Sequence, residues 1–177
     1  MEKLIGRKAE RAILEKALQS NEPEMVSVIG RRRVGKTFLI NRVYQEQIVF
    51  AISGTQNTPL KEQLANFAYL LNSYSTTNIP YKTPVSWQEA FQMLMSYLKE
   101  KIKATDGKLV VFFDELPWLA SPKSGFLRSF SFFWNNWAVH RNIVVVICGS
   151  AASWMIENVM RQPGGLYNRI TRRILFE

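Results

Sequence analysis

The amino-acid sequence predicts a three-layer α/β domain, in which helices cover both faces of a parallel β-sheet. Two runs, Leu109–Phe113 and Ile143–Cys148, are continuously apolar, as in interior strands of a sheet that is covered on both faces. Segments with helical periodicity alternate with such runs, which implies right-handed crossovers between parallel strands. No linker, internal repeat or low-complexity tract interrupts the alternation, so we expect one continuous domain over residues 1–177.

The individual elements follow from hydrophobic periodicity and from turn residues. Short β-branched runs predict strands over residues 25–29, 48–52, 109–113, 143–148 and 170–176. Amphipathic or apolar helical spacing predicts helices over residues 7–20, 37–45, 59–73, 87–104 and 125–141. The aromatic face of the 125–141 helix is either a partner-binding stripe or a surface packed on the sheet, and we expect packing. Its members are Phe126, Phe130, Phe133, Trp134 and Trp137.

Composition restricts the class of protein. Hydrophobic residues make up 47% and charged residues 21%, as in a globular domain. No apolar run is long enough to span a membrane, and the N-terminus is too charged for a secretory signal. The single cysteine, Cys148, excludes an internal disulfide framework, so we expect a cytoplasmic protein without a membrane partner.

The chain is strongly basic, with a net charge of +9. This excess fits a polyanionic partner such as a nucleotide or a nucleic acid, although a solvated basic surface has the same composition. Arginines form two local clusters, at residues 31–33 and at residues 169, 172 and 173.

A phosphate-binding motif follows the first predicted strand. Its sequence is Gly30-Arg31-Arg32-Arg33-Val34-Gly35-Lys36-Thr37, which fits G-x-x-x-x-G-K-[ST] at every fixed position. An apolar strand before the motif and an apolar helix after it, beginning at Phe38, make the match specific for ATP binding. The motif therefore predicts that ATP and Mg²⁺ bind to residues 30–38.

Each fixed position has a chemical reason. Gly30 and Gly35 allow the backbone angles and the close approach that a phosphate cradle needs. Lys36 places its charge on the β- and γ-phosphates, and the Thr37 hydroxyl is a ligand for Mg²⁺. The helix that begins there favours the anion through its dipole.

An acidic pair, Asp114 and Glu115, directly follows the strand at residues 109–113. Asp114 therefore emerges at the carboxyl edge of the sheet, where α/β proteins bind ligands, and we expect it to hold Mg²⁺. Glu115 is expected to orient and deprotonate the attacking water. The pair favours hydrolysis of ATP over phosphoryl transfer to a small molecule.

Ser150 follows the strand at residues 143–148 and reaches the same edge. Its hydroxyl either hydrogen-bonds the γ-phosphate or the lytic water, or caps a helix over residues 151–160. Three other residues are expected to do no chemistry. His140 ends the aromatic helix, and Cys148 is a buried and inert thiol. Trp118 either borders the nucleotide pocket or serves hydrophobic packing, and we expect packing.

Several segments together resemble the archaeal-type ATPases of the AAA+/STAND group of P-loop ATPases. They are Leu4-Ile5-Gly6-Arg7 with Glu10, GRRRVGKT, LVVFFDELPWLA, VVVICGSAASWM and GGLYNRITRRI, and they span nearly the whole chain. The resemblance implies an ASCE-type P-loop fold with strand order 5-1-4-3-2. It also implies an ATPase core alone over residues 1–177, because family members usually continue into a helical lid, a winged helix and often a nuclease-like domain.

The resemblance also implies roles for single residues. Ile5, Gly6 and Arg7 are expected near the adenine, and Ser150 is expected to act as a sensor. Arg169 resembles an arginine finger that completes the site of a neighbouring copy, with Arg172 and Arg173 as weaker candidates.

The leading hypothesis is an Mg²⁺-dependent ATPase whose hydrolysis is coupled to a partner, either DNA or protein. The alternative is a nucleotide-gated binding module with little hydrolysis, in which the arginine clusters contact DNA. A small-molecule kinase is a weaker third possibility, because the sequence has no visible acceptor site.

Overall fold

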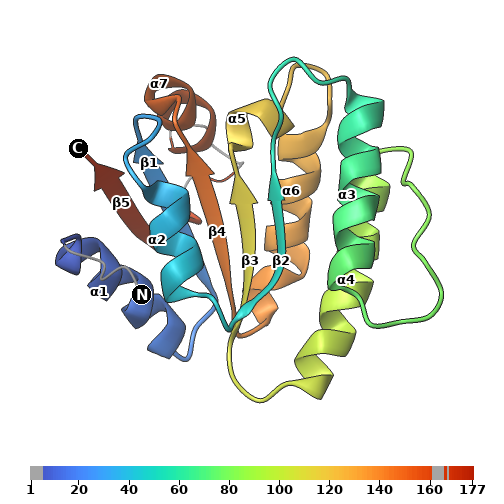
Figure 1. The fold of residues 1–177 in the computed structure, drawn as a ribbon, viewed down its shortest axis with the longest axis horizontal. Coiled ribbons are helices and arrows are strands. Elements are labelled where there is room, and N and C mark those ends of the chain that lie inside the picture. The colour runs from blue at the N-terminus through green and yellow to red at the C-terminus, as the bar shows by residue number, and fades with distance from the viewer. Residues whose placement is uncertain (1–5, 161–165, 167) are drawn as a thin grey trace.

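The computed structural model describes residues 6–160, 166 and 168–177. Figure 1 shows one sheet of parallel strands in the order β2-β3-β4-β1-β5. The strands are β1 (Glu24–Gly30), β2 (Ile48–Ser53), β3 (Leu109–Asp114), β4 (Ile143–Gly149) and β5 (Arg172–Phe176). The predicted three-layer fold and its strand order are therefore confirmed.

Helices connect the strands and cover both faces of the sheet. They are α1 (Lys8–Gln19), α2 (Lys36–Val43), α3 (Leu60–Tyr74), α4 (Trp87–Ala104), α5 (Leu116–Leu119), α6 (Phe126–Asn136) and α7 (Ala152–Met155), with a 3₁₀ turn η1 (Ala138–His140) and a π turn η2 (Ile156–Met160). In Figure 1, α1 and α2 lie in front of the sheet and α6 lies behind it. None of the helices in the described part of the chain is long and apolar enough to cross a membrane.

Alternation of side chains along the strands builds two separate cores. In β1, Val26 and Val28 pack with the residues of α1 and α2, whereas Met25 and Ile29 belong to the core under α3, α4 and α6. Successive strand residues point to opposite faces, so a strand buried on both sides must be apolar throughout. This is why the interior strands read as continuous apolar runs.

The aromatic face of α6 packs on the sheet, as predicted. The Phe130 ring lies 5.3 Å from the Phe113 ring of β3, and the Phe133 ring lies 5.3 Å from the Phe91 ring of α4. The helix predicted to Arg141 ends earlier, at Asn136, and η1 follows, with His140 as its last residue.

The last strand begins two residues later than predicted, because a side chain replaces the backbone in the ladder. The hydroxyl of Thr171 accepts the Met25 N–H at 3.0 Å, and the Thr171 N–H donates to the Met25 carbonyl at 2.8 Å. Regular pairing with β1 then starts at Arg172, opposite Val26.

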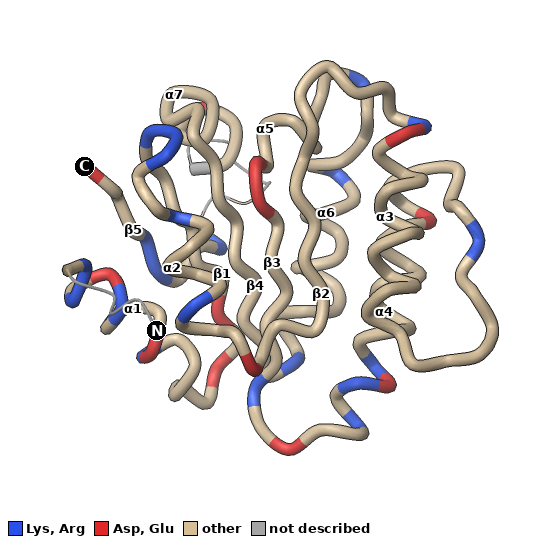
Figure 2. The backbone as a smooth tube through the Cα atoms, viewed as in Figure 1, with Lys and Arg blue, Asp and Glu red and all other residues tan. Residues whose placement is uncertain are grey.

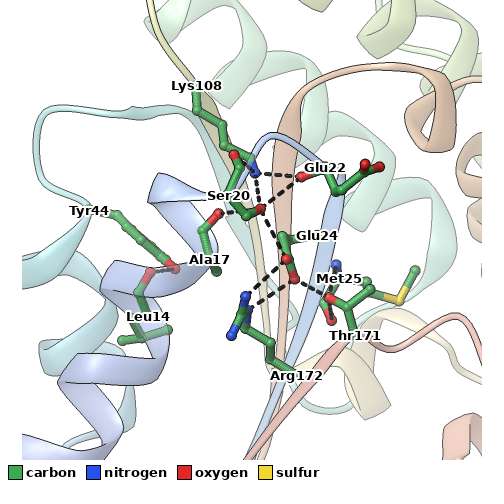
Figure 3. Close-up of polar contacts among 10 residues, drawn as sticks. All are labelled: Leu14, Ala17, Ser20, Glu22, Glu24, Met25, Tyr44, Lys108, Thr171 and Arg172. Carbon is green, nitrogen blue, oxygen red and sulfur yellow. Dashed lines mark hydrogen bonds and ion pairs between the residues drawn. The ribbon is translucent and has the colours of Figure 1, made fainter.

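An ion pair with a buried carboxylate closes the edge of the sheet where the strands begin (Figure 3). The Glu24 carboxylate accepts from Arg172 through Nε at 3.1 Å and Nη2 at 3.2 Å, and also from the Thr171 hydroxyl. Burial alone would raise the pKa of Glu24, but the hydrogen bonds from Thr171 and Arg172 outweigh it and hold the pKa below its ordinary value. The pair ties β5 to β1.

Lys108 extends this network to the start of β3 (Figure 3). Its ammonium donates to the Ser20 carbonyl at 3.0 Å, to the Ser20 hydroxyl at 2.9 Å and to the Glu22 carbonyl at 2.5 Å. Burial lowers the pKa of Lys108 from its ordinary value. Because the partners lie in the segment between α1 and β1, the lysine fixes that segment against β3.

Candidate nucleotide-binding site

The phosphate-binding loop lies at the opposite edge, where the strands end. Figure 1 shows the β1–α2 loop, α5 and α7 together at this edge. The loop curls around Lys36, whose side chain is buried and whose Nζ donates to the carbonyls of Gly30 at 2.6 Å and Arg31 at 2.5 Å. Arg33 and Gly35 have positive φ values of 62° and 90°, so the loop adopts the conformation that the motif predicts.

The two glycines of the motif serve different purposes. Gly35 has positive φ and forms the N-cap of α2. At Gly30 the chain approaches β5 closely, because a Cβ there would lie 2.5 Å from the Cβ of Phe176. That both glycines also serve the phosphate stays a prediction.

Thr37 and Asp114, both predicted magnesium ligands, are in direct contact. The Thr37 Oγ1 donates to the Asp114 Oδ2 at 2.7 Å, across 77 positions of sequence. The other oxygen of Asp114 accepts the Glu115 N–H at 2.9 Å, which fixes the carboxylate plane. One hydroxyl and one carboxylate oxygen, beside a phosphate loop, form the donor set that Mg²⁺ takes together with phosphate oxygens and water. The residues present thus fit this ion.

Glu115 and Ser150 are also brought together. Glu115 has a left-handed backbone, with φ 49° and ψ 50°, and its Oε2 accepts the Ser150 hydroxyl at 3.1 Å. Of the two roles left open for Ser150, helix capping is excluded, because α7 begins after Ala151 without a side-chain cap. The hydroxyl that follows β4 instead donates to the carboxylate that follows β3, and its role at the γ-phosphate or the lytic water stays a prediction.

Two residues that hold this turn were missed by sequence reasoning. The Gly54 N–H donates to the Asp114 carbonyl at 2.9 Å, and a Cβ on Gly54 would lie 2.5 Å from the Glu115 carbonyl oxygen. The buried Gln63 donates through Nε2 to the Trp118 carbonyl at 2.7 Å. A glycine that directly follows an apolar strand was the available signal for Gly54.

A cavity of about 370 Å³ opens between the loop and α5. Its lining residues are Arg32, Arg33, Gly35, Lys36, Thr37, Phe38, Glu115 and Trp118. Of the two placements left open for Trp118, the structure shows the border of the cavity, since its half-buried ring lies 4.3 Å from the guanidinium carbon of Arg32. Figure 2 shows the loop arginines at the same edge as the acidic turn after β3.

The remaining motif residues divide between the cavity and its surroundings. Phe38 lines the cavity with half of its surface exposed. Arg31 is exposed but does not line the cavity, and Val34 packs against the core of α1 and α2. Contact of Arg31, Val34 and Phe38 with the nucleotide stays a prediction.

The segment expected at the adenine begins outside the described residues, with Ile5. Gly6 and Arg7 both have positive φ, and Arg7 lies 4.5 Å over the ring of Phe176. Phe176 pairs with Gly30, so Arg7 stands at the same edge as the phosphate loop. Contact of these residues with the adenine stays a prediction.

The candidate arginine fingers lie elsewhere. Arg169 is exposed and comes two residues before Thr171, which pairs with Met25 at the start of β1. A strand rises about 3.3 Å per residue, so the length of β1 separates Arg169 from the phosphate loop of its own chain. Arg172 is engaged by Glu24, whereas Arg173 is exposed.

Cys148 has the inert environment that was predicted. It is fully buried within β4, and burial raises the pKa of its thiol well above the ordinary value. Among the described residues no group of three or more His, Cys, Asp and Glu side chains is placed to hold a metal ion.

The fold and the loop define a P-loop nucleotide-binding domain of the ATPase class. The sequence matches, over residues 4–175, a family described as an ATPase domain predominantly from Archaea, and the chain belongs to this family. No curated protein matches it.

Solved structures with the same fold are longer proteins. The Walker-type ATPase PABY2304 of Pyrococcus abyssi has a TM-score of 0.69 at 21% identity, over 96% of this chain and 53% of its own. Cdc6p from Pyrobaculum aerophilum has a TM-score of 0.66 at 19% identity, and the match covers 99% of this chain and 46% of Cdc6p. Drosophila ORC bound to DNA has a TM-score of 0.57 at 17% identity, and the match covers 96% of this chain and 40% of the ORC chain. The chain thus spans about half of these proteins or less.

Proposed function

We propose that the chain binds ATP with Mg²⁺ and hydrolyses it to ADP and phosphate. The observation that supports this most is the contact between Thr37 and Asp114 at 2.7 Å, with the Glu115–Ser150 pair beside it. Thr37 and the candidate general base Glu115 line one cavity, and Asp114 reaches it through its hydrogen bond with Thr37. Membership of an ATPase family agrees with this activity.

The residues divide the work by position. Lys36 and the loop N–H groups bind the phosphates, and the N-terminus of α2 favours their charge. Thr37 and Asp114 would hold Mg²⁺, which neutralises phosphate charge when bound. Glu115 accepts a proton from the attacking water through its carboxylate, and the Ser150 hydroxyl keeps that carboxylate oriented.

Two substitutions test the assignment of binding and chemistry to different residues. Lys36→Ala should abolish ATP binding, whereas Glu115→Gln should preserve binding and reduce phosphate release by about 10²- to 10⁴-fold. Binding is measured by isothermal titration calorimetry and turnover by release of inorganic phosphate. Glu46→Gln removes an exposed carboxylate after α2 and serves as the matched control. Equal loss of ATP binding in the Lys36 and Glu115 variants would contradict these roles.

Coupling to a partner is part of the same proposal. Arg169 is exposed at the edge away from its own phosphate loop, so it is available only to the site of another copy or to a polyanion. One structural neighbour, ORC, is bound to DNA. Binding of DNA by this chain is tested by a salt titration, since phosphate contacts give a steep fall of log K with log salt. Absence of binding at about 50 mM salt would leave a protein partner or a homo-oligomer.

A further inference from the structure

Arg32 and Trp118 face each other across the mouth of the nucleotide cavity. Arg32 belongs to the phosphate loop and Trp118 to α5, and the guanidinium carbon lies 4.3 Å from the ring centroid. Both line the cavity that Lys36 and Glu115 also line. Within the described ranges, no carboxylate forms an ion pair with Arg32. A cation therefore rests on an aromatic face beside the expected position of a triphosphate.

The two partners differ in how firmly they are held. Gln63 binds the Trp118 carbonyl, and Gly54 packs so closely that a Cβ there would lie 2.9 Å from the Cβ of Trp118. Leu116 and Leu119, on the same turn, are fully buried. Arg32 instead lies on an exposed loop. The tryptophan is thus anchored, and the guanidinium is the part that is free to move.

The place of Trp118 indicates which phosphate the guanidinium can reach. The Trp118 N–H donates to the Glu115 carbonyl at 3.0 Å, so the ring is on the same turn as the candidate general base. A general base must stand beside the water that attacks the terminal phosphate. If Glu115 is that base, a cation held over its turn lies on the side of the cavity that the γ-phosphate would occupy.

We propose that Arg32 leaves the Trp118 ring when ATP binds and hydrogen-bonds the γ-phosphate, so that each chain supplies its own charge-neutralising arginine. This rests on the proposed function. A cation–π contact at an exposed site is weak, whereas a guanidinium–phosphate pair is charge-assisted and bidentate, so the exchange of partners is favourable. ADP lacks the γ-phosphate, and in its presence Arg32 stays on the ring. Trp118 thus positions Arg32 beside the site before ATP binds, and only a nucleotide with a γ-phosphate draws the arginine off the ring.

Nucleotide selectivity gives the first test. Calorimetry compares a non-hydrolysable ATP analogue with ADP, both with Mg²⁺, on the full chain and its variants. Arg32→Ala should lower the affinity for the triphosphate analogue about 10- to 100-fold and the affinity for ADP less than about threefold. The reason is that a hydrogen bond to a charged group is lost only in the triphosphate complex. Arg32→Lys should give an intermediate loss of affinity for the triphosphate, because lysine keeps the positive charge but cannot form the bidentate hydrogen bonds of a guanidinium. Arg42→Ala removes an exposed arginine of α2 outside the cavity and should leave both affinities unchanged.

Tryptophan fluorescence gives a second readout that needs no turnover. The triphosphate analogue should change the emission of the wild-type chain, and ADP should change it less. Trp118→Phe should abolish the change although four other tryptophans remain, and Arg32→Ala should abolish it as well.

The outcomes separate the two proposals. If the wild-type chain binds neither nucleotide, the proposed function fails and this inference fails with it. If it binds both and Arg32→Ala weakens them equally, or weakens neither, ATP binding stands and the assignment of Arg32 to the γ-phosphate is overturned. A triphosphate that binds without changing Trp118 emission would also overturn the exchange of partners.

Discussion

The two edges of the sheet use the same kinds of residue for opposite purposes. Where the strands begin, four donor atoms from Ser20, Thr171 and Arg172 lie within hydrogen-bonding distance of the Glu24 carboxylate. Where they end, Asp114 accepts two hydrogen bonds and Glu115 accepts one. A carboxylate has about four acceptor sites, so Glu24 is saturated and the acidic pair is not. Unused hydrogen-bonding capacity, rather than residue type, distinguishes a site from a structural network.

Removing an acid from the unsaturated edge should give the largest effect on activity. Asp114→Asn is expected to reduce phosphate release by about 100-fold or more, because a neutral amide is a poor ligand for Mg²⁺. The melting temperature should change by no more than roughly 2 °C, since the amide oxygen can still accept the Glu115 N–H while the amide nitrogen donates to the Thr37 hydroxyl. Phosphate-release assays and thermal denaturation measure the two quantities. Asp106→Asn, in an exposed turn, is the matched control. Unfolding of the Asp114 variant would show that both edges are structural.

A substitution of Glu24, at the edge where the strands begin, should instead affect stability and not activity. Glu24→Gln breaks a buried pair with Arg172 and should lower the free energy of unfolding by about 2 kcal/mol, or the melting temperature by roughly 4–8 °C. Phosphate release per folded molecule should not change. Glu22→Gln, two residues earlier and exposed, should leave stability unaltered. A loss of turnover without a loss of stability in the Glu24 variant would reverse the roles assigned to the two edges.

The Glu24–Arg172 pair should also make the free energy of unfolding depend on pH. The folded-state pKa of Glu24 lies below its unfolded value. Its contribution is therefore fully present above about pH 4.5 and is lost as the pH falls through the folded-state pKa. Urea unfolding between about pH 3 and 6 should give a shallower acid slope for Glu24→Gln than for the wild type. Identical slopes would mean that Glu24 titrates alike in the folded and unfolded chains.

The nucleotide edge was predictable where chemistry requires a local pattern. The phosphate loop and the Asp114–Glu115 pair each lie next to an apolar strand, so sequence alone placed them at one edge. The position of Trp118 was not predictable, because its half-buried setting depends on Gly54 and Gln63 from distant elements. The role of Ser150 was open for a similar reason, since the carboxylate that it contacts, Glu115, follows a different strand. Local patterns determine the elements, and long-range contacts determine which side chains meet.

Gly54 shows how closely that edge is built. In Gly54→Ala the new methyl group would lie 2.5 Å from the Glu115 carbonyl oxygen, so the turn must move. We expect a loss of about 1 kcal/mol in stability and a roughly tenfold fall in phosphate release, since small displacements of a catalytic group are costly. Ser53→Ala, at the preceding exposed position, should change neither. Full activity in Gly54→Ala would mean that the turn tolerates displacement of Glu115.

The smallest expected effect comes from the single hydrogen bond that Glu115 accepts. Ser150→Ala leaves the acid charged and in place but removes the donor at 3.1 Å. We expect kcat to fall about three- to tenfold, with KM and the melting temperature unchanged, because one hydrogen bond to a charged group is worth about 1 kcal/mol or somewhat more. Ser153→Ala, exposed on α7, is the control, and Ser150→Thr should restore activity because it returns the hydroxyl. A fall in stability comparable to that of Glu24→Gln would show that this contact belongs to the fold, and the contrast between the two edges would then be one of degree.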